Sequence, residues 1–161
     1  MLNERWDDQY GRMLRVRDVL VKAGPRDWDF GSAQAWDALY HFFQDAFHRK
    51  DWIKAERPNG IAPADVEELF DSDPTKSEVE MRLCADLCNR TKHAELKKVI
   101  RTGDPQTRFA SQSVNVYVGA GAAHTWTIES SNKTYDVATV VGKIVATWDK
   151  WLAAKGLQPS P

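Results

Sequence analysis

Apolar side chains recur every three or four positions along most of the chain, which is the spacing of amphipathic α-helices. The pattern predicts a helix from Leu2 to Ala23, a second from Ser32 to Glu56 and a short third over 63–70. Asp73-Pro74, an N-cap residue followed by proline, predicts the start of a fourth helix that runs to about Ile100. A last helix is expected after a cap at Asn132 or Thr134, with an apolar stripe formed by Val137, Val141, Ile144, Trp148 and Leu152.

The apolar spacing changes to two between Ser113 and Ile128, which is typical of β-strands. Two alternating segments, 113–118 and 124–128, flank a connection of glycine and alanine, so we predict a β-hairpin at about 112–129. A hairpin alone is marginally stable and must pack on the helices. The sequence therefore predicts a mainly α fold: one domain over 1–161, a bundle of four to five helices with a β-hairpin inserted before the C-terminal helix.

Composition and cysteine usage place this domain inside the cell. The 161 residues are 42% apolar and 28% charged, as in globular proteins. The two cysteines, Cys84 and Cys88, are four apart on a predicted helix, where disulfide geometry is rarely met. The chain opens with polar residues and no apolar run is long enough to span a bilayer. We expect a cytoplasmic protein with no membrane partner.

Charge is balanced overall but uneven along the chain. The formal net charge is −1, so the whole molecule does not attract nucleic acid by its charge. Residues 57–80 carry seven acidic and two basic side chains, whereas residues 87–108 carry six basic and two acidic ones. The basic segment is interpreted either as an anion-binding surface or as one of two solvated faces.

The fourth predicted helix carries the most informative set of polar side chains. Arg82, Asp86, Asn89 and His93 are separated by steps of four, three and four, so they share one face of that helix. A guanidinium, a carboxylate, an amide and an imidazole together are able to bind an anion and transfer a proton. Arg90, Lys92 and Lys97 are candidate binding residues beside them. The alternative is an ordinary solvent-facing stripe.

The second predicted helix repeats this arrangement. His41, Asp45 and His48 share a narrow face, away from an aromatic stripe formed by Trp36, Leu39, Tyr40, Phe43 and Phe47, and we take these three as further binding candidates. Two histidines and a carboxylate are able to hold a transition metal, but their order matches no metalloenzyme signature. We predict no metal and no cofactor, and we expect Cys84 to pack in the core as a small hydrophobic residue.

With Asn89-Arg90-Thr91-Lys92-His93 on a late helix of a bundle, the chain resembles the HEPN superfamily. That resemblance implies a metal-independent ribonuclease or an RNA-binding protein of a defence or toxin–antitoxin system, often dimeric. Asn89 and His93 match the polar residue and the histidine of the family motif, and Cys88 stands at the position of its arginine. His93 is then the expected general acid or base, with Asn89 and Arg82 orienting phosphate. The stretches 40–52 and 86–93 are also similar to uncharacterised bacterial and phage proteins, which implies no activity.

Two functions therefore stay open. The first is an HEPN-like protein directed at RNA, by binding or by cleavage. The second is a non-catalytic interaction module, a homodimer or the partner of another protein, with contacts expected around Trp52 or Trp151 because exposed aromatic side chains favour interfaces.

Overall fold

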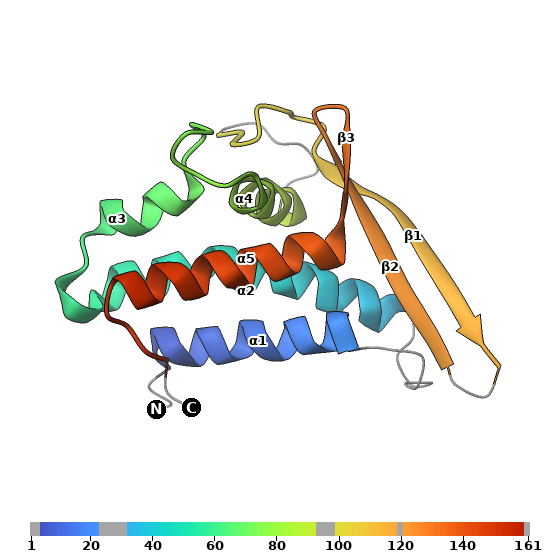
Figure 1. Cartoon of the computed structure of the whole chain (residues 1–161), viewed down its shortest axis with the longest axis horizontal. Helices are drawn as coiled ribbons and strands as arrows, with labels where there is room; N and C mark the ends of the chain where they lie inside the picture. The colour runs from blue at the N-terminus through green and yellow to red at the C-terminus, as the bar shows by residue number, and fades with distance from the viewer. Residues whose placement is uncertain (1–3, 23–31, 93–98, 119–120, 160–161) are drawn as a thin grey trace.

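The computed structural model describes residues 4–22, 32–92, 99–118 and 121–159. Three helices, α1 (Trp6–Lys22), α2 (Ser32–Glu56) and α5 (Val137–Ala154), run side by side, and α4 (Val79–Lys92) runs across them (Figure 1). A small antiparallel sheet stands at one end of these helices and precedes α5 in the chain. The predicted mainly helical fold, with its strands directly before the C-terminal helix, is confirmed.

The helix bounds agree with the predicted ones for α2 and differ elsewhere. Within the described residues α1 begins at Trp6, whose backbone N–H donates to the Glu56 carboxylate (2.6 Å) and ties the start of α1 to the end of α2. Leu2 and Ala23, the predicted ends of the first helix, lie outside the described residues. The short third helix is α3 (Pro63–Glu67), continued by the 3-10 turn η2 (Glu68–Phe70), and another 3-10 turn, η1 (Pro58–Gly60), precedes it.

The predicted start of the fourth helix at Asp73 is wrong, because α4 begins at Val79. The Asp73 carboxylate accepts hydrogen bonds from the backbone N–H (2.9 Å) and the hydroxyl (2.8 Å) of Thr75, only two residues further on. These local bonds close a turn at this point, and such turns compete with helix formation. The chain reaches Val79 only after this turn.

The predicted hairpin is part of a larger sheet. Three antiparallel strands, β1 (Arg108–Tyr117), β2 (Gly121–Ser130) and β3 (Lys133–Asp136), lie in the order β1-β2-β3. Ser131 and Asn132 both have positive φ, 51° and 59°, which is the geometry of a tight turn between twisted strands. Because β3 occupies 133–136, the predicted caps at Asn132 and Thr134 are wrong, and Asp136 caps α5 by accepting from the Thr139 backbone N–H (2.8 Å).

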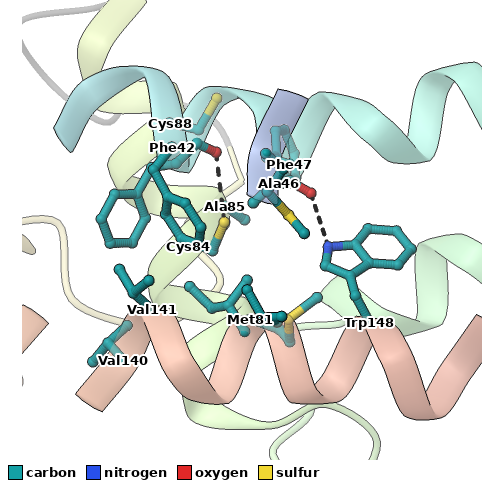
Figure 2. Packing of buried hydrophobic residues seen from close by; sticks show 14 of the residues in the cluster. Phe42, Ala46, Phe47, Met81, Cys84, Ala85, Cys88, Val140, Val141 and Trp148 are labelled. Carbon is teal, nitrogen blue, oxygen red and sulfur yellow. Dashed lines mark hydrogen bonds between the residues drawn. The ribbon is translucent and has the colours of Figure 1, made fainter. Parts of the chain in front are cut away.

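The core lies where α2, α4 and α5 meet (Figure 2). Trp148 of α5 is fully buried and its Nε1–H donates to the carbonyl oxygen of Ala46 on α2 (3.1 Å). Cys84 is also fully buried and its thiol lies 3.6 Å from the carbonyl oxygen of Phe43, as expected for a small core residue, and burial raises its pKa well above the ordinary value. The predicted apolar stripe of the last helix is confirmed, since all its members are buried: Val137, Val141, Ile144, Trp148 and Leu152.

Candidate functional site

A hollow of about 560 Å³ opens between α2, α4 and the start of β1. One face of α2 supplies Trp36, Tyr40 and His41 to its lining, and Arg90 comes from the end of α4. Arg108 and Phe109, the first two residues of β1, close the third side. Because residues three and four apart share a helix face, the regular spacing of α2 is what brings its aromatic rings and an imidazole to one wall.

The aromatic rings of the hollow contact one another. Trp36 and Tyr40 are stacked, with centroids 5.8 Å apart and ring planes at 27°. Phe109 meets both rings edge-on, 5.5 Å from Tyr40 and 6.1 Å from Trp36. Tyr40 is 37% exposed, so part of its ring surface stays open to a ligand. Aromatic surfaces of this kind accept planar groups by stacking.

A chain of side-chain hydrogen bonds holds Trp36 to the sheet. The indole N–H of Trp36 donates to Oε1 of Gln112 (2.8 Å), so the amide nitrogen of Gln112 faces Nδ1 of His124 (3.0 Å). An amide nitrogen only donates, so His124 accepts at Nδ1 and carries its proton at Nε2 when neutral. These bonds fix one wall of the hollow.

Two guanidinium groups give the hollow its positive charge. Arg90 reaches over the chain before β1, with Nη1 3.4 Å from the carbonyl oxygen of Pro105 and 3.5 Å from that of Thr107. Arg108 pairs with Glu129 across the β1–β2 ladder (3.0 Å) and is half exposed, so its charge is partly solvated. Asp37 is the one carboxylate that lines the hollow among the described residues. This lining favours an anion.

The predicted site residues of the fourth helix do not share one open face. Asp86 is fully buried, and its carboxylate accepts from the backbone N–H groups of Arg101 (2.9 Å) and Thr102 (2.8 Å) and from the Thr102 hydroxyl (2.7 Å). Asp86 therefore anchors the chain that follows α4. Arg82 and Asn89 are partly buried, and neither lines the hollow.

Arg90 is the predicted binding residue of α4 that lines the hollow. His93 and Lys97 lie outside the described residues, as does the side chain of Lys92. The catalytic role of His93 stays a prediction from the sequence.

The predicted triplet on α2 separates into three environments. His41 lines the hollow and is exposed. Asp45 is half-buried, and burial raises its pKa against the opposing charge of Arg12 on α1. His48 lies between α2 and α4, with Nε2 3.5 Å from the Cys88 sulfur and Nδ1 3.3 Å from the Asp51 carboxylate.

The helices α2 and α4 are thus neighbours, and polar side chains join them. Besides the contact between His48 and Cys88, the amide of Gln44 donates to the Thr91 hydroxyl (3.0 Å) at the rim of the hollow. Across 4–22, 32–92, 99–118 and 121–159, no three His, Cys, Asp or Glu side chains cluster so as to hold a metal ion. None of the helices in these ranges is long and apolar enough to cross a membrane.

No protein-family model, curated protein or solved structure matches this chain. The chemistry of the hollow is therefore what indicates a function. The sequence did not identify Trp36 and Tyr40 as site residues. They belong to an aromatic stripe at helical spacing, which is typical of core residues. Arg108 and Phe109 precede the predicted hairpin, and no local pattern sets them beside α2.

Proposed function

We propose that this chain is an RNA-directed, HEPN-like protein that holds a single-stranded RNA segment in the hollow between α2, α4 and β1. The observation that supports this most is the combination, in one hollow, of aromatic rings with two guanidinium groups and an imidazole, contributed by Trp36, Tyr40, His41, Arg90, Arg108 and Phe109. Unpaired bases stack on aromatic rings while basic side chains neutralise the phosphates between them. In this role the protein acts in the cytoplasm, in a defence or toxin–antitoxin system.

Binding is the first part of the proposal. Fluorescence anisotropy with a labelled single-stranded RNA measures the dissociation constant, and a duplex of the same sequence shows whether unpaired bases are needed. Tyr40→Ala is expected to weaken binding about tenfold, since one lost base stack costs about 1–3 kcal/mol. Arg12→Gln, on exposed α1 surface, is the control and leaves the affinity unchanged. If the wild-type protein binds no RNA, the proposal fails and a non-catalytic interaction module becomes the better account.

Cleavage is the second part, and it needs a general acid or base within reach of the RNA 2′-hydroxyl or the leaving oxygen. The hollow itself offers His41, and the sequence motif offers His93. Labelled RNA is incubated with the wild type and with His41→Ala and His93→Ala, each with EDTA present. Cleavage that survives EDTA and disappears in one variant identifies that imidazole. Binding without cleavage makes the protein an RNA binder and removes the nuclease.

A further inference from the structure

β1 is an uncovered edge of the sheet. It pairs with β2 on one side, and no described element runs along its other side (Figure 1). With ten residues it is long for a strand in a globular protein, where about five or six is usual. An edge of this length presents a row of backbone N–H and C=O groups that are ready to pair with another strand.

Beyond the start of β1, the outer part of this edge, from Ser111 to Tyr117, lacks the features that normally prevent such pairing. Native proteins protect edge strands with charged side chains, prolines or bulges. From Phe109 to Ile128 the sequence has no Asp, Glu, Lys, Arg or Pro. The one irregularity in the register lies between Phe109 and Ser111, so the outer part of β1 pairs regularly with β2 as far as Tyr117.

The outer part of β1 carries an exposed apolar stripe. Val114 and Val116 are 44% and 68% exposed, and they point to the same side as Gln112, since alternate residues of a strand share a face. Gln112 is held by Trp36, whereas no described side chain holds the exposed valines further out in this way. Ser113 and Asn115 are exposed on the opposite face.

Within the described residues, the same part of the sheet has two strands. β3 pairs with β2 from Thr127 to Ser130, so the described ribbon beyond the Gln112–Trp126 pair consists of β1 and β2. A two-stranded ribbon is marginally stable in water, and a third strand stabilises it. The open side of β1 is where that strand fits.

We propose that two copies of this chain pair antiparallel along β1, across a two-fold axis at Asn115, and so form one continuous sheet. In this register Val114 of each copy lies opposite Val116 of the other. The two edges are therefore self-complementary, as a two-fold interface requires. Because the edge is uncharged, the pairing brings no like charges together. A second copy is therefore the occupant that the edge fits, and this inference does not depend on RNA binding.

Sedimentation velocity on the full chain tests the pairing. The wild type is expected to sediment as a dimer of the 18.3 kDa chain. Residues directly opposite each other have Cβ atoms about 4.5–5.5 Å apart, so Asn115→Lys and Asn115→Glu each place like charges in contact across the axis and abolish the dimer. An equimolar mixture of the two variants restores it, because opposite charges then meet, and this rescue shows that both variants are folded.

Thr125→Lys is the matched control. Thr125 is exposed on β2, where it pairs with Ser113, so the substitution adds the same charge to the same face of the ribbon but away from the outer edge. This variant stays dimeric. A wild type that remains monomeric at high concentration overturns the proposal. So does a dimer that both Asn115 variants retain, because its interface then lies elsewhere.

Discussion

The guanidinium of Arg49 lies over the ring of Tyr10, with its central carbon 3.9 Å from the ring centroid. The same carbon lies 4.5 Å from the ring centroid of Trp148, so the cation is held between aromatic rings of α1 and α5. Arg49 is 1% exposed, and none of its three guanidinium nitrogens has a hydrogen-bond partner among the described residues. Attraction to the ring faces and to the Asp149 carboxylate therefore opposes the free-energy cost of removing the charge from water.

The attraction and the cost of desolvation are of similar size. Each ring contact of a desolvated cation contributes about 2 kcal/mol, and burying a charge costs several kcal/mol. We therefore expect Arg49→Met, which keeps most of the volume, to change the free energy of unfolding by less than about 1.5 kcal/mol. Arg49→Ala leaves a cavity and is expected to lower it by about 3 kcal/mol. Urea unfolding of both variants measures the difference. Equal losses would mean that the charge, and not the packing of the side chain, is what stabilises this part of the core.

Asp86 gives a prediction that separates a structural role from a catalytic one. Asp86→Asn removes the charge that accepts three hydrogen bonds from Arg101 and Thr102, and it turns an amide toward those donors. We expect the free energy of unfolding to fall by about 3 kcal/mol, because hydrogen bonds to a buried charged group contribute about 1.5–3 kcal/mol. Thr102→Val removes one donor and is expected to cost about 1 kcal/mol.

The RNA affinity and RNA cleavage of Asp86→Asn are then measured at a temperature where this variant is fully folded. RNA affinity and any cleavage within twofold of wild type fit a residue that only anchors the chain. If the variant is folded and binds RNA normally but no longer cleaves it, Asp86 has a catalytic role.

Asp51 makes stability depend on pH. Burial alone would raise its pKa, but hydrogen bonds from Lys54 and Lys50 outweigh this effect and hold the pKa at about 2. A carboxyl whose pKa is lower in the folded state stabilises the fold at neutral pH, and that stabilisation disappears as the pH falls from about 4 to about 2. Because the side chain is 47% exposed, the contribution is below about 1 kcal/mol.

Asp51→Asn is therefore expected to reduce stability at pH 6 and to match the wild type near pH 2, as measured by urea unfolding across this range. Glu68→Gln, at an exposed position nearby, serves as the control. A constant difference between Asp51→Asn and wild type at every pH would show that the ion pairs do not cause it.

Local patterns in the sequence account for most of the fold. Periodicity located α2 and the buried stripe of α5 because burial on one side of a helix repeats every three to four residues. The capping signal at Asp73-Pro74 was misleading, because the Asp73 side chain bonds to Thr75 and closes a turn before the helix begins. Periodicity also missed β3, because the turn at Ser131 and Asn132 reaches positive φ without a glycine.

The candidate site was less predictable than the fold. Its rings and charges come from α2, α4 and β1, and no spacing within one element encodes the contact between Tyr40 and Phe109. The predicted face of α4 failed at Asp86 because α4 is buried on every side from Leu83 to Cys88, so a polar residue there points into protein rather than solvent. Sequence reasoning finds helix faces, but only packing decides which of them remain open.

Salt dependence tests whether Arg90 binds phosphate. For single-stranded nucleic acids the logarithm of the binding constant falls with the logarithm of the salt concentration by about 0.7 for each phosphate neutralised. Arg90→Gln is thus expected to weaken RNA binding and to flatten this slope by about 0.7, whereas Tyr40→Ala weakens binding at an unchanged slope, because stacking releases no counterions. Anisotropy titrations over a range of salt concentrations measure both. If Arg90→Gln lowers the affinity without flattening the slope, its guanidinium supports the wall of the hollow through Pro105 and Thr107 and does not contact the RNA backbone.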